Sequence, residues 1–524
     1  MDTFFITTAI DYPNGAPHIG HAYEKVLGDV IARYRRLRGD QVYFLTGVDQ
    51  HGQKMQQTAD RENVNVATLA KRNTRKFVAL WKKLDLAYDG WAETTDDRHK
   101  QCVQRILTSL HEQGQLYKKP YRGFYSVRQE QYLTEKDRNE QGQFGPEWGE
   151  VLELEEENWY FKLSDHAEWL REAVTTGAFG VLPDFRRAEV LNAIERASDT
   201  DLCVSRPRER LHWGIEIPFD PEFVTYVWFD ALINYISFAG YRKEDGAGLP
   251  DFETLWPAQA HIIGKDILVP AHSIYWPCML HAMGFRDEQM PTLLVHGWWN
   301  IRGEKMSKSL GNVVDPDQLA DRFGADALRY YLVRDIVTGK DSDFDPERLV
   351  MLFNTELAND LGNLLNRSIN MTKRFLHGQL PETHYDDDQC AALRDSLQAV
   401  RAAYHAAMDD YDVAGALKAL NAHVVHCNGF AERNKPWALA KEEAQADRLA
   451  AVLAHLCESC AHLAVLLSPV LPGASARIAG QLRADDLLPA RSDDLAWGLL
   501  PPGHQTGKPK PVFPRIEIPE ETCG

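Results

Sequence analysis

Hydrophobic and polar positions along the first fifty residues alternate between two regular patterns. Residues 4–10 (FFITTAI) are mostly apolar, with two threonines, and predict a β-strand that is buried on at least one face. After the turn-rich run 11–21 (DYPNGAPHIGH), apolar residues recur at helical spacing, at Ala22, Val26, Leu27, Val30, Ile31 and Tyr34. Residues 42–45 (VYFL) are again strand-like and end at 46–52 (TGVDQHG). This order of strand, loop, helix and strand predicts a parallel α/β sheet, which binds ligands at the carboxyl ends of its strands.

The pattern changes several times further along the chain. From about residue 116 to 205 it becomes irregular and rich in charge, and strand–helix texture then returns. Beyond residue 350 the chain is alanine-rich with few glycines, which is typical of a helical bundle. The predicted fold is a Rossmann-type α/β catalytic domain with a connective insertion, followed by a helical domain. The predicted segments are 1–115 and 206–296 (the two catalytic halves), 116–205 (the insertion), 297–350 (a lysine loop and a connecting region), 351–500 (the helical domain) and 501–524 (a Pro/Gly-rich tail).

The motif at residues 17–21 (PHIGH) carries the first candidate chemistry. His18 and His21 are three residues apart at the start of the predicted helix, so they share one face. Gly20 lets a flat ligand approach the backbone, and a helix N-terminus favours phosphate. The motif therefore fits a nucleoside triphosphate, although two surface histidines at a helix cap would look the same.

The second motif is residues 304–312 (EKMSKSLGN), which place Lys305 and Lys308 on a loop of serine and glycine. Transfer of a nucleotidyl group builds negative charge on the departing pyrophosphate, and catalysis is mostly placement of positive charge there. A loop that opens to admit ATP and closes over it needs small residues. An exposed polar hairpin is the alternative, and the PHIGH motif upstream favours the catalytic interpretation.

Composition restricts the class of protein. The net charge of −18 argues against a broad basic surface for non-specific nucleic-acid binding, but allows RNA on a local patch. The longest apolar runs fall short of a membrane span, and the N-terminus lacks a basic signal region, so we expect a cytoplasmic protein. Eight scattered cysteines indicate a reducing compartment. The one closely spaced pair, Cys457 and Cys460, lies in an apolar helical run and suggests buried thiols.

The PHIGH and KMSKS pair resembles the paired signature of class I aminoacyl-tRNA synthetases. Within that class, further runs resemble methionyl-tRNA synthetases, and together they span nearly the whole chain. These runs are 4–40, 46–52 (TGVDQHG), 226–235 (YVWFDALINY), 262–267 (IIGKDI), 296–300 (HGWWN), 358–367 (ANDLGNLLNR) and 433–437 (RNKPW).

The resemblance implies ATP with Mg²⁺ as cosubstrate and L-methionine as the amino acid. It implies that His18, His21, Lys305 and Lys308 stabilise the phosphates, and that ATP also meets Gly20, Gly264, Asp266, His296, Gly297 and Trp298. Asp49 would hold the substrate ammonium, and the thioether would lie among Ile10, Tyr12, Trp228, Ala231, Leu232, Tyr235 and His272. The spacing of 228, 231, 232 and 235 is also plain helical core spacing. Residues 264–273 (GKDILVPAHS) depart from the family pattern by one extra residue, Pro270.

The resemblance also implies partners. Asn363, Arg367 and Trp437 match the positions that read the anticodon of tRNA(Met), initiator and elongator; a buried tryptophan and a solvated arginine are the alternative. Many relatives carry Cys-x-x-Cys zinc knuckles in the insertion, but this chain has no cysteine between 102 and 203, so we expect no structural zinc. The chain ends at 524 without the C-terminal extension of many relatives, so we expect a monomer. No DNA or membrane partner is expected.

Two kinds of rival function remain at this stage. Class I ligases for leucine, isoleucine or valine carry a long editing domain, and the insertion of about 90 residues is too short for one. Cysteine ligases bind zinc through thiolates in the pocket, and the cysteines here are not arranged for it. A non-catalytic RNA-binding relative is the rival from a different class, and the intact PHIGH and KMSKS motifs argue against it.

Overall fold

The centre of the computed structural model is a six-stranded parallel sheet in the order β3-β2-β1-β11-β12-β7. The structure describes residues 2–126, 131–133, 135–139, 141–197, 199–301, 303–305, 313–486 and 491–516. The strands are β1 (Thr3–Thr8), β2 (Gln41–Val48), β3 (Gly90–Glu93), β7 (Gly180–Leu182), β11 (Ala260–Gly264) and β12 (Thr292–His296). The strand order reverses between β1 and β11, and the carboxyl ends of strands at such a switch point form the ligand crevice of open α/β sheets.

Both faces of this sheet are covered, which explains why consecutive residues of the first strand, Phe4, Phe5 and Ile6, are all apolar. Phe4 and Ile6 point into one hydrophobic cluster and Phe5 points into the other, as the two-residue repeat of a strand requires. The first cluster includes residues of α1 (Ile19–Arg38), α3 (Val66–Lys83) and α11 (Ala325–Arg334). The second includes residues of α4 (Asp97–Glu112), α7 (Val227–Ser237) and α9 (Trp276–Ala282). The predicted parallel α/β fold is confirmed.

The predicted insertion, residues 116–205, forms an antiparallel sheet of four strands and also adds to the central sheet. The antiparallel strands are β4 (Leu116–Ser126), β5 (Gln131–Leu133), β6 (Val151–Phe161) and β8 (Leu202–Cys203). Between them in the chain come α5 (Ala167–Thr176), β7 and α6 (Arg187–Ala197). β7 pairs in parallel with β12, so this segment completes the edge of the catalytic sheet. At three residues, β7 is too short for its hydrophobic pattern to show.

Short elements connect these parts. The first catalytic half also holds α2 (Gln53–Glu62), and the second begins at β9 (Ser205–Pro207) and holds β10 (Phe223–Thr225) and α8 (Phe252–Leu255). After β12 a small sheet forms from β13 (Trp299–Ile301), β14 (Glu304–Lys305) and β15 (Ser342–Asp343). Helix α10 (Pro316–Phe323) begins at the Asp315–Pro316 step, and the Asp315 carboxylate accepts a hydrogen bond from Asp317 N at 2.8 Å.

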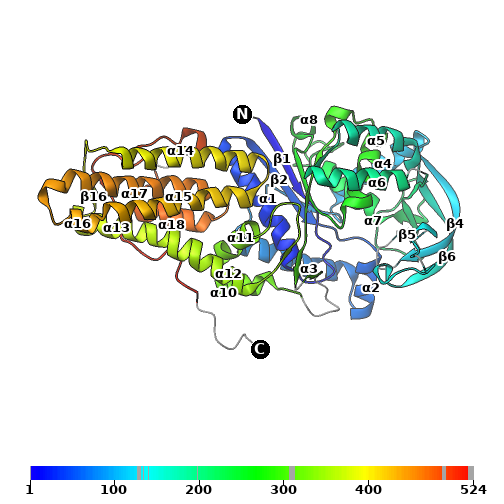
Figure 1. Ribbon diagram of the computed structural model, residues 1–524. Coiled ribbons are helices and arrows are strands. Elements are labelled where there is room, and N and C mark those ends of the chain that lie inside the picture. Colours follow the sequence, from blue (N-terminus) through cyan, green and yellow to red (C-terminus); the bar gives the residue numbers. More distant parts are fainter. Residues whose placement is uncertain are drawn as a thin grey trace.

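The helical domain lies at the opposite end of the molecule from the antiparallel sheet, with the central sheet between them (Figure 1). Its helices are α12 (Pro346–Leu352), η8 (Phe353–Gly362), α13 (Asn363–Leu376), α14 (Asp388–Asp409), α15 (Val413–Asn434), α16 (Pro436–Leu439), α17 (Ala446–Leu467) and α18 (Pro472–Leu482). By length and composition, the segment Glu443–Leu467 could cross a membrane, but 94% of its most apolar window is buried inside the domain. It therefore packs as a core helix, and Cys457 and Cys460 are buried in it as expected.

One buried arginine fastens the helical domain to the catalytic domain. Arg329 of α11 pairs with Asp29 of α1 at 2.7 Å, and both side chains are fully buried. Its guanidinium also donates to the carbonyls of Val470 at 2.9 Å and Pro469 at 2.8 Å, between α17 and α18. A buried ion pair is costly unless its hydrogen bonds are completed, and here the guanidinium donates to oxygens from both domains. The relative placement of the two domains depends on this residue.

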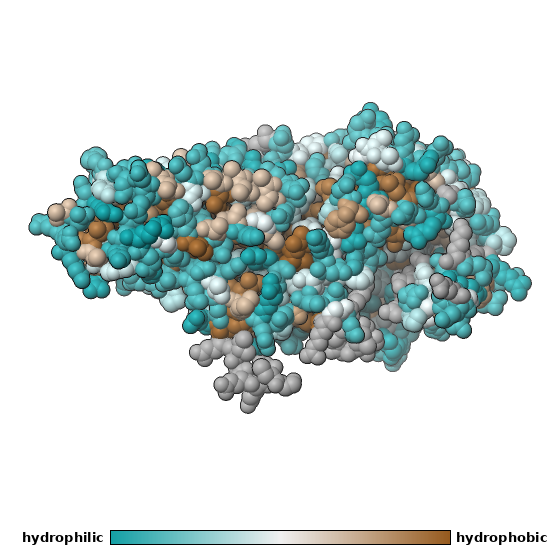
Figure 2. Space-filling view, in the orientation of Figure 1, coloured by the Kyte–Doolittle hydropathy of each residue, from teal (hydrophilic) through white to brown (hydrophobic). Residues whose placement is uncertain are grey.

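The C-terminal segment runs back along the helical domain. β17 (His504–Gln505) pairs with β16 (Gln379–Leu380), and further on Asn354 and Ile516 exchange hydrogen bonds of 2.8 and 3.0 Å. The predicted Pro/Gly-rich tail thus packs on the helical domain up to residue 516, beyond which it lies outside the described residues. In the face seen in Figure 2, hydrophilic residues predominate and hydrophobic ones form scattered patches.

Candidate functional site

The two histidines of the PHIGH motif form a reciprocal cap at the start of α1. His18 Nδ1 accepts a hydrogen bond from Gly20 N at 3.1 Å, and His21 Nδ1 accepts one from His18 N at 3.1 Å. The two rings lie 3.8 Å apart, centroid to centroid. Because both Nδ1 atoms accept, a neutral ring carries its hydrogen on Nε2. The cap therefore fixes two imidazoles with Nε2–H as the donor, at a helix terminus that favours anions.

The lysine motif is described only at its edges. Lys308 and the rest of 306–312 lie outside the described residues, and for Lys305 the structure describes its place in β14, not its side chain. On the N-terminal side, β14 pairs with β13, which follows β12 directly. On the C-terminal side, Val314 O accepts from Ile19 N at 3.2 Å, at the first residue of α1. Both ends of the motif thus start beside the elements that carry the predicted ATP residues.

The predicted ATP residues at the ends of β11 and β12 lie together. A Cβ at Gly264 would come within 2.6 Å of Asp266 Oδ1 and 3.6 Å of the His296 ring, so a larger residue would displace the Asp266 side chain. The indole N–H of Trp298 donates to Asp266 Oδ1 at 3.2 Å. A Cβ at Gly297 would meet the carbonyl of Lys340 at 2.1 Å. Both glycines are buried, and the Asp266 side chain is exposed beside them.

The predicted methionine residues on the loops after β1 and β2 are joined by backbone hydrogen bonds. Asp11 N donates to Gly47 O at 2.9 Å, and Asp49 N donates to Asp11 O at 2.8 Å. This sets Asp49 beside the loop that holds Ile10 and Tyr12. One oxygen of Asp49, Oδ1, accepts from Thr94 Oγ1 at 3.2 Å and from His51 N at 3.3 Å. The carboxylate is buried and held in one orientation.

The remaining predicted methionine residues gather around His272. Burial lowers the pKa of His272 to about 4, so its ring is neutral at pH 7. Its Nδ1 donates to Ile267 O at 2.9 Å, so Nε2 accepts from the hydroxyl of Tyr235 at 2.8 Å. Trp228 lies edge-on to the same ring at 6.1 Å, so the extra Pro270 leaves His272 beside α7. Ala231 and Leu232 of α7 are buried, and Leu232 belongs to the hydrophobic core, as its helical spacing allows.

Sequence reasoning missed a buried ionic cluster beneath this crevice. Lys25 is fully buried and donates to Ala9 O at 2.7 Å, Asp11 Oδ1 at 2.8 Å and Glu24 Oε1 at 2.6 Å. The other oxygen of Glu24 lies 3.1 Å from His296 Nε2. Burial raises the pKa of Asp11 to about 7 despite the neighbouring ammonium. The signal was present: Glu24 and Lys25 are a charged pair at positions surrounded by apolar residues of the same helix.

The predicted anticodon residues lie together at the far end of the helical domain, on α13 and α16 (Figure 1). The Arg367 guanidinium lies 5.5 Å from the centroid of the Trp437 ring and pairs with Glu432 at 2.7 Å. Trp437 is 38% exposed, so it is not the ordinary buried tryptophan of the alternative interpretation. Asn363 is exposed, four residues from Arg367 on the same helix. Together they present an aromatic face, a cation and an amide to solvent.

Two families of known sequences match this chain. The family described as "tRNA synthetases class I (M)" matches residues 4–142 and 148–369. The family described as "Anticodon binding domain of methionyl tRNA ligase" matches residues 380–522, in the helical domain. The chain belongs to the methionyl-tRNA synthetase family.

Members of this family resemble the chain over nearly its full length. A methionine–tRNA ligase of Listeria innocua is 40% identical and one of Halalkalibacterium halodurans is 38% identical; each alignment covers 99% of this chain and 79% of the relative. Among solved structures, the Mycobacterium tuberculosis methionyl-tRNA synthetase in complex with methionyl-adenylate is 35% identical with a TM-score of 0.90, covering 98% of this chain and 100% of that one. The free-state crystal structure of that enzyme has a TM-score of 0.85 at 32% identity and covers 99% of each chain.

In the insertion, where the resemblance places the zinc knuckles of many relatives, this chain buries a cation of its own. The Arg206 side chain lies over the rings of Tyr226 at 4.4 Å, Tyr132 at 4.7 Å and Tyr125 at 5.3 Å. It also donates to Ser205 O at 2.7 Å and to Cys203 Sγ at 3.3 Å. A guanidinium enclosed by aromatic faces joins β4, β5 and β9.

One group of side chains elsewhere has the spacing of a metal site. Ligand atoms of Asp386, Cys390 and His455 lie within 4.8 Å of one another. Arg394 already bonds two of the three: it donates to both oxygens of Asp386, at 3.0 and 2.6 Å, and to His455 Nε2 at 2.8 Å. Burial raises the pKa of the Cys390 thiol to about 12, which opposes the thiolate that zinc needs. Arg394 thus already binds the carboxylate and the imidazole nitrogen that a metal ion would need.

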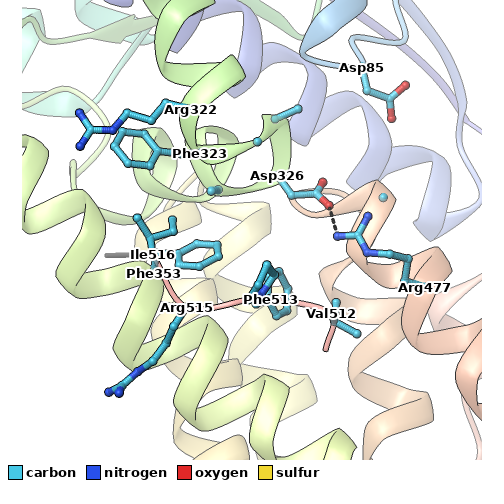
Figure 3. Close-up of a pocket in the computed structure, with 15 residues that line it drawn as sticks. Asp85, Arg322, Phe323, Asp326, Phe353, Arg477, Val512, Phe513, Arg515 and Ile516 are labelled. Atoms are coloured by element: carbon cyan, nitrogen blue, oxygen red, sulfur yellow. Dashed lines mark hydrogen bonds and ion pairs between the residues drawn. The ribbon is translucent and has the colours of Figure 1, made fainter. Parts of the chain in front are cut away.

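A cavity of about 660 Å³ lies apart from all the predicted site residues, between α11, α18 and the C-terminal segment (Figure 3). Its floor is apolar, with Phe353 and Phe513, and its rim is charged. Asp326 and Arg477 face each other there at 3.2 Å, and Arg322 and Arg515 point away from the centre. The cavity thus lies where α11, α18 and the C-terminal segment meet, and the Asp326–Arg477 ion pair is part of its lining.

Proposed function

We propose that this methionine–tRNA ligase forms methionyl-adenylate in the crevice at the carboxyl ends of β1, β2, β11 and β12. One observation carries the proposal: the capped histidine pair, the Asp49 loop and the glycine-lined ends of β11 and β12 meet at one edge of the sheet. ATP lies over Gly20, Gly264 and Gly297, and methionine lies between Asp49 and α7.

In the first half-reaction the methionine carboxylate attacks the α-phosphorus of ATP, and pyrophosphate leaves. A carboxylate is already a nucleophile, so no general base is required and catalysis is positioning and charge. The Nε2–H groups of His18 and His21 donate to phosphate oxygens, and Lys305 and Lys308 meet the charge of the departing pyrophosphate. Mg²⁺ arrives bound to ATP and neutralises part of that charge. The adenylate then esterifies the 3′-terminal ribose of the tRNA.

Methionine is recognised by one charged contact and an apolar wall. Asp49 holds the ammonium, a charge-assisted hydrogen bond worth about 1.5–3 kcal/mol. The thioether lies against Trp228, Tyr235 and the neutral His272, and sulfur beside aromatic edges gains about 0.3–1.5 kcal/mol. Because the Tyr235 hydroxyl donates to His272, neither presents an unsatisfied polar atom to the thioether.

The helical domain reads the anticodon CAU of tRNA(Met), initiator and elongator alike, through Trp437, Arg367 and Asn363. We further expect a cytoplasmic monomer without a DNA or membrane partner. These remain predictions.

Amino-acid-dependent exchange of pyrophosphate into ATP tests the proposed substrate. Exchange should depend on methionine and be poor with leucine or cysteine. Because an apolar pocket distinguishes one methylene by only about 1–3 kcal/mol, homocysteine should support measurable exchange, about 10- to 200-fold less efficiently than methionine. Leucine-driven exchange equal to that with methionine would refute the assignment.

The purified protein should contain no stoichiometric zinc. Elemental analysis is expected to find far less than one zinc per chain, and dialysis against a chelator should leave the melting temperature unchanged. A structural zinc contributes folding energy directly, so its removal would lower that temperature. One zinc per chain that survives gel filtration would contradict the prediction, and Cys390→Ser would then test whether the group around Arg394 binds it.

A further inference from the structure

A network of hydrogen bonds between buried polar groups extends from the Asp49 loop to the far side of α7. His51, two residues beyond Asp49, places Nδ1 2.7 Å from Asp230 Oδ2. The other oxygen of Asp230 lies 2.8 Å from His99 Nε2, and His99 Nδ1 lies 2.8 Å from Ser237 Oγ. All of these side chains are buried. None of the groups beyond Asp49 was predicted from the sequence to belong to the site.

The directions of these hydrogen bonds follow from the carboxylate. Although burial opposes its charge, the two imidazoles hold the pKa of Asp230 below its usual value, so both oxygens accept. His51 Nδ1–H and His99 Nε2–H are therefore the donors to Asp230. One carboxylate thus binds two imidazole donors from two different elements, the loop after β2 and helix α4.

Asp230 belongs to the helix that carries the proposed methionine wall. It lies next to Ala231 and two residues from Trp228 on α7. Through His51 it is joined to the loop that presents Asp49, whose Oδ1 also accepts from His51 N at 3.3 Å. The anchor for the ammonium and the wall for the side chain belong to elements separated by more than 170 residues, and this carboxylate sets the distance between them.

We infer that Asp230 is a positioning residue for methionine, which holds α7 and the Asp49 loop at the separation that the amino acid spans. The inference rests on the proposed location of the methionine site. Asp230 acts through His51 and does not itself touch substrate. Displacing a binding group by about 1 Å weakens a site by up to about 100-fold, so loosening this link affects methionine selectively. The proposed ATP residues, on α1, β11 and β12, do not belong to this network of hydrogen bonds.

The Asp230→Asn variant tests the inference in the pyrophosphate exchange assay. Asparagine offers one accepting oxygen and an NH₂ group, so one of the two imidazole N–H donors faces another donor and the link opens. We expect the KM for methionine to rise about tenfold or more, while the KM for ATP stays within about twofold of wild type. Asp326→Asn, in a peripheral ion pair of α11, is the matched control and should change neither constant.

Two further variants separate the possible outcomes. Asp49→Asn tests the site itself: if it leaves the KM for methionine unchanged, the proposed methionine site is wrong. If Asp49→Asn raises the KM for methionine but Asp230→Asn does not, the positioning role is refuted. It is also refuted if Asp230→Asn raises the KM for methionine and the KM for ATP equally. If thermal melting shows that Asp230→Asn is unfolded, the His51→Gln variant provides the test. It removes the hydrogen bond between residue 51 and Asp230, while His99 still donates to Asp230. The same selective rise in KM supports the inference, and its absence overturns it.

Discussion

The His21→Asn variant is expected to form methionyl-adenylate about 100- to 1000-fold more slowly than wild type in a single turnover, the usual cost of losing one preorganised donor to developing charge. Asparagine is short enough to keep the cap, because its side-chain oxygen replaces Nδ1 as acceptor for His18 N. It lacks any group at the position of Nε2, so the donor to phosphate is lost. The charge that this donor meets develops during the reaction, so the KM for methionine should stay nearly constant.

A second variant, His21→Gln, places an amide with a longer side chain at the same position and is compared with His21→Asn. As the third residue of α1, glutamine also accepts from His18 N through its side-chain oxygen, and its amide N–H extends toward the position of Nε2. We expect it to recover much of the adenylation rate and to keep the melting temperature close to that of wild type, because the capping box is kept. A rate for His21→Asn within threefold of wild type would show that the histidine is only a helix cap. Quenched-flow experiments with labelled ATP measure the rate of adenylate formation for both variants.

The regular elements of this chain could be predicted because their patterns are local. The run 4–10 showed a buried strand, and the Asp315–Pro316 step showed a helix start, because each depends on residues within a few positions. β7 shows the limit. Gly180–Leu182 is too short for a pattern, and only its pairing with β12, more than a hundred residues away, makes it a strand of the catalytic sheet.

The sequence singles out residues whose chemistry suits a ligand, and it misses residues that bind each other inside the protein. Glycines and histidines in a turn before a helix have a recognisable ligand chemistry, so His18 and Gly20 stood out. Lys25 and Asp230 are buried ions whose partners come from distant parts of the chain, and their role depends on which acceptors surround them. The sequence marks such residues only as charges in apolar helices. Arg329, which fastens the two domains, is of the same kind.

The helical spacing of the α7 residues also left two interpretations open. Leu232 lies in the hydrophobic core, whereas Tyr235 both packs in that core and donates to His272. Helical periodicity identifies the buried face of a helix. It does not separate core residues from pocket-lining residues, because both are apolar and share the same spacing. That distinction came from the hydrogen bond to His272, which the spacing does not encode.

The Trp437→Ala variant should lose about 5- to 150-fold in tRNA aminoacylation, equivalent to about 1–3 kcal/mol for one stacked base. Unpaired anticodon bases offer flat faces and free Watson–Crick edges. Trp437 supplies an exposed ring, and Glu432 holds the Arg367 guanidinium beside it. Methionine-dependent pyrophosphate exchange should stay nearly intact, because that half-reaction needs no tRNA and helix α16, which carries Trp437, lies at the opposite end of the helical domain from α1 (Figure 1).

A second tryptophan of the same domain provides the matched control. Trp497 is 37% exposed against 38% for Trp437, but its ring lies beside His455 and His462 and not beside a cation. Trp497→Ala removes the same side chain at the same exposure, and should leave both assays within about twofold of wild type because surface truncations cost little stability. If both variants lose aminoacylation equally, the effect is a general weakening of the helical domain. If Trp437→Ala loses exchange as well, the residue supports the fold of the whole chain, and the anticodon is read elsewhere.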